Sequence, residues 1–240
     1  MASLNPNLKS FWADDKGKLT RSRVRVLYGG RASSKSWEFC ARIAQIAQQY
    51  KTRVLCVRRF QNKIKESVYT LIKNQIDTFE LGGYKSLAST IEHENGSEFV
   101  FYGIERNIDE VKSFEGADIL YIEEAHNLTK EQWEILEPTI RKQGSEIWIS
   151  FNPRLITDFI YQNFIVDPPL NSIIRKVNYD ENPFLSSTML ETIEELKVKD
   201  FERYEHVYLG KPLSDDEQVI IKRSWVEASI DFHLKYDGDM

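Results

Sequence analysis

The feature that most constrains the fold is a short apolar segment that runs into a glycine- and serine-rich loop and then directly into a helix. The apolar residues lie between positions 24 and 28, and 37–50 follows with helical periodicity. A loop in that position points several backbone N–H groups at one place, beside the positive end of the helix dipole, and this geometry binds phosphate. We therefore predict a triphosphate-binding loop made of Gly29, Gly30, Arg31, Ala32, Ser33, Ser34, Lys35 and Ser36.

Three side chains of this loop have predicted roles. Lys35 would reach the β- and γ-phosphates of ATP, and the Ser36 hydroxyl would bind Mg²⁺. Arg31 can stabilise charge that develops on the transferred phosphoryl group. Ser34 stands where the usual pattern has glycine, which predicts backbone strain or a slightly shifted loop. An ordinary turn between a strand and a helix, carrying a surface lysine, is the alternative.

A second apolar segment, 119–122, ends in two carboxylates. Glu123 is predicted to hold Mg²⁺, and Glu124 is predicted to polarise the water that attacks the γ-phosphate, from a position just beyond the strand end. The first residue of such a pair is usually aspartate, so the longer Glu123 predicts a shifted metal or an inserted water. Alternatively, the two glutamates only cap the turn that follows the strand.

A third polar segment follows the next predicted strand, 147–149. It consists of Ser150, Phe151 and Asn152, and Asn152 is placed to contact the γ-phosphate or the attacking water. The alternative is a turn formed by Asn152 and Pro153, since both residue types are common in turns.

Short apolar strands alternate with helical patterns along most of the chain, and this predicts an α/β fold with a mostly parallel sheet covered by helices on both faces. Asn95 and Gly96 predict a hairpin within 91–102. Residues 1–22 are expected to form a leading arm outside the core. Further strands and helices are expected at 54–57, 62–80 and 130–142, and a small helical appendage from about 179.

Composition narrows the class of protein. The 240 residues suit one large domain, or a core domain with a small appendage. The formal net charge of −5 argues against a protein that coats polyanions in general. Cys40 and Cys56 lie in apolar patterns and are expected to be buried thiols in a reducing compartment. No stretch approaches the length of a membrane span, and no signal-peptide pattern is present, so we expect a cytosolic protein.

Four stretches together resemble the large terminase subunit, the DNA-packaging ATPase of tailed bacteriophages, and most closely its headful-packaging branch. The resemblance covers nearly the whole chain. It is carried by the loop at 29–36, by 113–118 leading into 122–125, by 150–153, and by 182–185.

The resemblance implies a P-loop ATPase of the ASCE type that drives DNA into a procapsid. It implies an ATPase domain at 1–178, a linker (lid) subdomain at 179–213, and a connector at 214–240 toward a nuclease domain that this chain lacks, as in an N-terminal fragment. The implied site consists of the cis arginine Arg31, the phosphate- and Mg²⁺-binding Lys35 and Ser36, the metal residue Glu123, the catalytic Glu124, and the coupling segment 150–152.

The resemblance also implies partners and a location. The partners are double-stranded viral DNA, the portal protein of the procapsid and the small terminase subunit. We expect a homo-oligomeric ring on the portal and a monomer in isolation, with no membrane contact. The expected location is the host cytoplasm, docked transiently on the procapsid and absent from the mature virion.

The sequence leaves several points open. The adenine pocket could involve Phe11 and Trp12 or Arg58 and Arg59. An arginine or lysine acting on a neighbouring subunit could be Arg106, Lys112 or Arg141. His93 is expected to be solvated and His126 to be a loop residue. A helicase, which would need a second RecA-like domain, and a nucleotide-dependent binding switch with little turnover are the rival functions.

Overall fold

The central element is a sheet of eight strands in the order β3-β4-β5-β2-β6-β7-β1-β8. The computed structural model describes residues 3–59 and 64–214, without the side chains of residues 65, 106 and 107. Six strands, from β5 to β8 across the sheet, run parallel, and β4 and β3 add an antiparallel hairpin edge. The strands are β1 (Val24–Tyr28), β2 (Arg53–Arg58), β3 (Tyr84–Ser86), β4 (Thr90–His93), β5 (Glu98–Gly103), β6 (Ile119–Glu123), β7 (Glu146–Phe151) and β8 (Ser172–Lys176).

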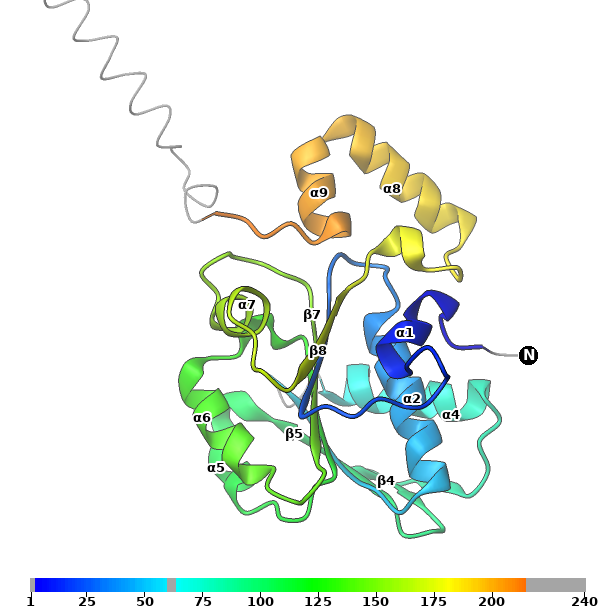
Figure 1. Ribbon diagram of the computed structural model, residues 1–240. Helices are drawn as coiled ribbons and strands as arrows, with labels where there is room; N and C mark the ends of the chain where they lie inside the picture. Colours follow the sequence, from blue (N-terminus) through cyan, green and yellow to red (C-terminus); the bar gives the residue numbers. More distant parts are fainter. Residues whose placement is uncertain (1–2, 60–63, 215–240) are drawn as a thin grey trace, which may run out of the picture.

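Helices cover both faces of the sheet (Figure 1). On one face lie α1 (Lys9–Trp12), α2 (Lys35–Gln49) and α4 (Thr70–Thr78), and on the other lie α5 (Ile104–Lys112), α6 (Lys130–Thr139) and α7 (Phe159–Tyr161). The pair α8 (Ser187–Lys199) and α9 (Phe201–Leu209) lies above one end of the sheet. Short helical turns are η1 (Pro6–Leu8), η2 (Lys65–Tyr69), η3 (Ala125–Asn127), η4 (Gln162–Val166) and η5 (Tyr179–Glu181).

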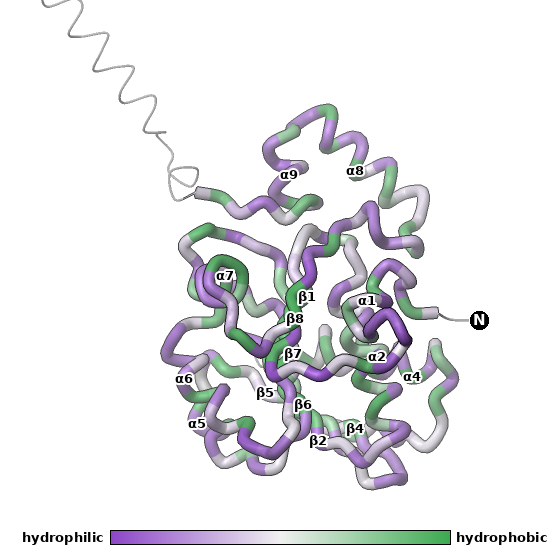
Figure 2. The backbone as a smooth tube through the Cα atoms, viewed as in Figure 1, coloured by the Kyte–Doolittle hydropathy of each residue, from purple (hydrophilic) through white to green (hydrophobic). Residues whose placement is uncertain are grey.

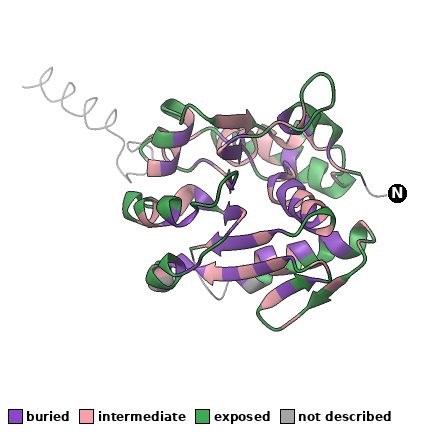
Figure 3. Ribbon diagram, turned by 60° about the horizontal axis from the view of Figure 1, so that its bottom comes forward, coloured by how far each residue is buried: buried purple, intermediate pink, exposed green. Residues whose placement is uncertain are grey.

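The predicted α/β class is confirmed. The apolar strand residues alternate between two hydrophobic clusters, one under α1, α2 and α4 and the other under α5, α6 and α7. Hydrophobic residues accordingly follow the strands through the middle of the molecule (Figure 2), and the central strands are buried while the helices each keep an exposed face (Figure 3). Strand β7 lies between β1 and β6, so the three strands that lead into the predicted site residues are neighbours in the sheet.

Local chemistry explains several element boundaries. Gly96 has a φ of 86°, which glycine adopts without strain, and it closes the predicted hairpin between β4 and β5. Thr129 and Gln132 form a reciprocal capping box at the start of α6. The helix predicted over 130–142 ends earlier, with Pro138 in its last turn, where proline cannot donate the helical hydrogen bond. Of the helix predicted over 62–80, residues 62 and 63 lie outside the described residues.

The prediction that residues 1–22 lie outside the core is wrong. Leu8, Phe11 and Trp12 have relative exposures of 0%, 2% and 4%, and their side chains pack in the cluster under α2. The aromatic rings of Trp12 and Trp148 are 4.9 Å apart between centroids. These apolar residues are buried because they fill the space between α2 and the sheet, whereas residues 14–19 of the arm are exposed.

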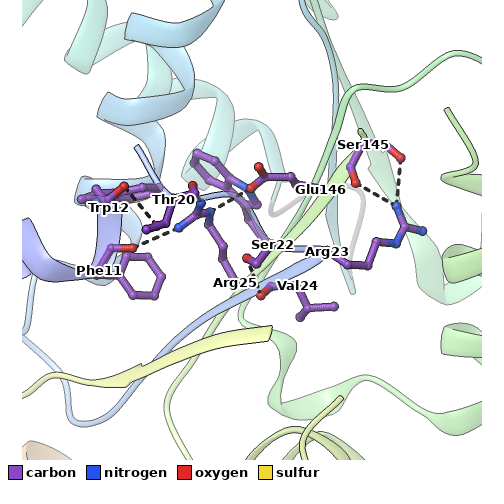
Figure 4. A network of polar contacts seen from close by, with 10 residues as sticks. Phe11, Trp12, Thr20, Ser22, Arg23, Val24, Arg25, Ser145 and Glu146 are labelled. Atoms are coloured by element: carbon purple, nitrogen blue, oxygen red, sulfur yellow. Dashed lines mark hydrogen bonds and ion pairs between the residues drawn. The ribbon is translucent and has the colours of Figure 1, made fainter. Parts of the chain in front are cut away.

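A buried arginine in β1 fastens this arm to the sheet (Figure 4). Arg25 is 2% exposed, and its guanidinium donates to Glu146 Oε2 at 2.8 Å and to the Phe11 carbonyl at 3.0 Å. It also donates to the Thr20 carbonyl, and Trp148 Nε1 donates to the same Glu146 oxygen at 2.9 Å. A charge this deep in the core is tolerated because its donors are paired with a carboxylate and two carbonyls.

The helix pair α8–α9 contacts the phosphate-loop segment by close backbone approach. The Arg31 amide donates to the Val207 carbonyl at 2.7 Å, and a Cβ at Gly30 would lie 1.9 Å from the Tyr208 carbonyl oxygen. The Gly30 amide donates to Asn178 Oδ1 at 2.9 Å. The domain boundaries at 178 and 213 remain predictions, and the connector at 214–240 lies, apart from Ser214, outside the described residues.

No helix within the described ranges has the length and apolar character needed to cross a membrane.

Candidate nucleotide-binding site

A cavity of about 500 Å³ lies at the carboxyl edge of the parallel strands. That volume falls within the range of small-molecule sites. Because the six strands are parallel, the segments after β1, β6 and β7 all leave the sheet at this edge. They bring the predicted residues to one place, and the cavity is lined by Arg31, Ala32, Ser33, Ser34, Lys35, Ser36, Trp37, Glu123, Glu124, His126, Ser150, Phe151 and Asn152.

The phosphate loop has a backbone suited to anions. Ala32 and Ser34 have φ values of 62° and 65°, in the left-handed region, while α2 begins at Lys35. Left-handed residues within such a loop turn successive N–H groups toward one concavity, beside the N-terminus of the helix. The strain predicted at Ser34 is therefore present. The Ser34 hydroxyl also accepts a hydrogen bond from Asn5 Nδ2 at 3.2 Å.

Lys35 is buried within its own loop, so the alternative of a surface lysine is wrong. Its relative exposure is 7%, and its Nζ donates to the carbonyls of Gly30 at 2.6 Å and Gly29 at 3.2 Å and lies 2.7 Å from Ser33 Oγ. Desolvation lowers the pKa of Lys35 to about 7, while the nearby Glu123 carboxylate acts in the opposite direction. The ammonium thus lies where a phosphate oxygen could replace the loop carbonyls.

Ser36 and Glu123 provide oxygen atoms of the kind that Mg²⁺ prefers. The Ser36 hydroxyl donates to Glu123 Oε1 at 3.3 Å, so a hydroxyl and a carboxylate from two different elements are already adjacent. Burial raises the pKa of Glu123, and Arg58 opposes this rise. A buried carboxylate with a raised pKa is stabilised by a cation, and these two residues therefore fit a bound Mg²⁺.

Glu124 stands in a strained position at the edge of the cavity. Its φ is 55°, in the left-handed region, where a non-glycine residue is held only by its surroundings. Arg58, at the end of β2, contacts both carboxylates: its Nε is 3.1 Å from Glu123 Oε2 and 2.8 Å from Glu124 Oε2. This double contact fixes the two acidic side chains relative to each other.

The last two residues of β7, Ser150 and Phe151, and the following Asn152 also line the cavity. Ser150 is 1% exposed and shares a hydrogen bond of 2.9 Å with the hydroxyl of Tyr121 on β6. Phe151 is buried and its ring stacks on Tyr28 at 5.9 Å between centroids. Asn152 and the exposed Arg31 both line the cavity, as their predicted roles require.

Sequence reasoning missed several residues that shape the site. Arg58 was one of the open candidates for the adenine pocket, but it pairs with both glutamates because β2 lies beside β6. Asn182 was noted only as part of a sequence stretch, yet its Nδ2 donates to the Ala32 carbonyl at 2.7 Å. Asn5 and Asn178 also contact the loop. Single asparagines outside helices and strands leave no periodic pattern in the sequence. The contact of Arg58 with the two glutamates could have been predicted only from the order of the strands.

Other candidates lie elsewhere. Phe11 and Trp12 are core residues and do not line the cavity, and Arg59 pairs with Glu105. His93, expected to be solvated, is buried at 8% exposure with Nε2 3.1 Å from the Gly82 carbonyl. His126 lines the cavity in η3, and burial lowers its pKa.

The candidates for a residue acting on a neighbouring subunit lie away from the cavity. Lys112 ends α5 and pairs with Asp109, and Arg141 follows α6 and pairs with Glu115. Both precede the strands β6 and β7, at the amino edge of the sheet, so neither contributes to the cavity of its own chain. The side chain of Arg106 lies outside the described residues.

The fold is similar to that of known phage proteins. The large terminase of a thermophilic bacteriophage has a TM-score of 0.72 at 13% sequence identity, over 88% of this chain and 54% of that one. The ATPase domain of the large terminase of Thermus phage P74-26 has a TM-score of 0.57 at 15% identity, over 79% of this chain and 88% of that one.

Sequence similarity leads to the same family. The terminase large subunit of Bacillus phage SPP1 is 27% identical over 208 residues, which cover 78% of this chain and 48% of that protein. The chain thus spans about half the length of this curated relative. Residues 21–211 match the family described as phage terminase large subunit, and this match includes every residue of the cavity. The chain belongs to the phage terminase large subunit family.

Proposed function

We propose that this chain is the ATP-hydrolysing part of a terminase motor that moves double-stranded viral DNA into a procapsid. One observation carries the proposal: Lys35 and Ser36, at the start of α2, and Glu123 and Glu124, at the end of β6, line a single cavity at the carboxyl edge of the sheet. Family membership supports nucleotide as the ligand, as do the ADP and ATP-gamma-S complexes of the large terminase from the thermophilic bacteriophage.

In binding, the loop amides and Lys35 hold the phosphates. The Lys35 ammonium exchanges the carbonyls of Gly29 and Gly30 for phosphate oxygens, and this exchange favours its protonated form. Ser36 and Glu123 would hold Mg²⁺, which supplies charge neutralisation on the β- and γ-phosphates. Arg31, at the exposed side of the cavity, would stabilise charge on the γ-phosphoryl oxygens.

In hydrolysis, Glu124 orients the attacking water and accepts its proton. Its position beyond the end of β6 places the carboxylate at the cavity, and Arg58 holds it there. Asn152, from the neighbouring strand end, is placed to contact the same water or the γ-phosphate. The water oxygen bonds to phosphorus, the bond to the bridging oxygen breaks, and ADP and phosphate result.

Coupling to movement would run through the contacts that the phosphate loop makes with α9 and with the segment that leads into α8. The Val207 carbonyl and the side chains of Asn178 and Asn182 bond directly to loop backbone atoms, so a loop displaced by phosphate also displaces these contacts. The proposed partners are double-stranded viral DNA, the portal protein, the small terminase subunit and further copies of the chain in a ring, in the host cytoplasm.

Phosphate release by purified variants tests this proposal. Lys35→Ala and Glu124→Gln should each lower the rate by about 100-fold, the low end for the loss of a general base or an essential phosphate contact. Lys130→Ala and Glu134→Gln are matched controls, since these exposed residues pair with each other on α6. Equal rates in the wild type and both site variants would refute the proposed chemistry. If Glu124→Gln still binds ATP but no longer releases phosphate, the wild-type chain is a hydrolase and not only a nucleotide-dependent binding switch.

A further inference from the structure

An aromatic side chain, Trp37, lines the cavity directly after the phosphate-loop residues. Trp37 follows Ser36 in the first turn of α2 and lines the cavity. Its ring lies 5.6 Å from that of Phe184 and 5.5 Å from that of Phe79, between centroids. Phe184 comes from the segment between η5 and α8 and is 49% exposed. Phe184 does not itself line the cavity, but its half-exposed side chain next to Trp37 leaves apolar surface that a ligand could cover.

This aromatic surface differs from the other aromatic residue of the cavity. Phe151 is 1% exposed and stacked on Tyr28, so it has no free face for a ligand. Among the described residues that line the cavity, Trp37 is the aromatic residue with accessible surface. The residues that the sequence suggested for the base are committed elsewhere, Trp12 to the core and Arg58 to the two glutamates.

The position of Phe184 is fixed relative to the phosphate loop. Asn182 donates from Nδ2 to the Ala32 carbonyl at 2.7 Å, and its Oδ1 accepts from the Phe184 amide at 3.1 Å. The loop, Asn182 and Phe184 are thus connected by two hydrogen bonds in series. Phosphates bound at the N-terminus of α2 lie next to Trp37, which is in the first turn of that helix, and Phe184 lies beside Trp37, so this ring pair is adjacent to the phosphate-binding residues.

We propose that Trp37 and Phe184 form the stacking surface for the purine base of the nucleotide. This inference rests on the proposed function and adds the ligand contact that the phosphate loop does not supply. Because Phe184 belongs to the segment leading into α8, base binding draws that segment onto α2. Stacking on aromatic rings tolerates different bases, so this surface selects a purine nucleotide without distinguishing adenine from guanine strongly.

The test compares a ligand with a base and a ligand without one. Phe184→Ala should weaken ATP binding about tenfold, the effect expected from loss of one stacking partner, and leave the affinity for inorganic tripolyphosphate unchanged. Phe201→Ala is the matched control, because Phe201 is a similarly exposed phenylalanine at 56%, on α9. Isothermal titration calorimetry with Mg²⁺ present measures both ligands, and circular dichroism checks that each variant is folded.

The outcomes separate this inference from the proposed function. Unchanged ATP affinity in Phe184→Ala, or an equal loss for ATP and tripolyphosphate, would overturn the stacking surface. Failure of the wild-type chain to bind either ligand would overturn the nucleotide site itself. As a second measurement, ATP should change the tryptophan fluorescence of the wild type more than that of Trp37→Phe. Tripolyphosphate should cause the same fluorescence change in both proteins. An identical change with both ligands would also contradict the inference.

Discussion

Substituting alanine for Gly30 should separate the α8–α9 pair from the phosphate loop. A Cβ at this position would lie 1.9 Å from the Tyr208 carbonyl oxygen and 2.1 Å from its carbon, whereas such contacts stay above 3.0 Å. Both partners are backbone atoms, so the clash cannot be relieved by a side-chain rotation. The two segments would have to move apart by about 1.1 Å. That movement lengthens the 2.7 Å hydrogen bond between the Arg31 amide and the Val207 carbonyl beyond bonding distance.

The lost hydrogen bond and the overpacked contact together set the free energy by which Gly30→Ala weakens the contact of α9 with the loop. The hydrogen bond contributes about 0.5–1.5 kcal/mol, and overpacking of a tight contact costs about 1–3 kcal/mol. A total of about 2–4 kcal/mol should reduce the protection of α9 amides against hydrogen exchange by about 30- to 1000-fold, if these amides exchange through local opening. Hydrogen exchange read by mass spectrometry measures this directly.

The matched control is Gly82→Ala. A Cβ at Gly82 meets nothing within 4 Å, so exchange in α9 should stay at the wild-type rate. If Gly30→Ala left the exchange of α9 unchanged, the close backbone contact would not exist in solution, and the proposed coupling through it would be refuted.

The charged groups lead to three more predictions. Burial lowers the pKa of Lys35 to about 7, whereas bound phosphate favours its charged form, so ATP binding at about pH 8.5 should take up protons. Calorimetry in buffers of different ionisation enthalpy should detect this proton uptake in the wild type and not in Lys35→Gln. Arg58 opposes the raised pKa of Glu123, so Arg58→Gln should raise that pKa further and move the acidic limb of the pH–rate profile to higher pH; an unmoved limb would contradict this. Arg25→Met should lower the free energy of unfolding, measured in urea, by about 3 kcal/mol. This value is at the low end for a broken buried ion pair because the Glu146 side chain is 17% exposed. Arg21 is exposed, so the control Arg21→Met should change the free energy of unfolding little.

The parts of the structure that sequence could predict are those encoded locally. The apolar run before Gly29, the loop and the helical periodicity after Ser36 are contiguous, and each element has the conformation that its own residues favour. The pair Glu123 and Glu124 follows a buried run in the same way. Because parallel strands share one carboxyl edge, these local patterns also predicted that the loop and the glutamates would meet.

The parts that could not be predicted depend on which strands are neighbours and on what covers the sheet. Arg58 contacts the two glutamates only because β2 pairs with β6, and nothing near Arg58 in the sequence encodes that pairing. Phe11 and Trp12 looked like part of a polar arm, since their burial depends on α2 and Trp148 more than 20 residues away. The bond from Asn5 to Ser34 likewise joins segments that only the fold brings together.

The central claim is that Lys35 and the two glutamates act on one triphosphate. A crystal structure of this chain with Mg²⁺ and a slowly hydrolysed ATP analogue tests it most directly. The account predicts that Lys35 Nζ leaves the Gly30 carbonyl for the β- and γ-phosphates, that the metal lies between Ser36 and Glu123, and that Glu124 faces the γ-phosphate. A nucleotide bound outside this cavity, or a Lys35 still bonded to its own loop with the nucleotide in place, would contradict it.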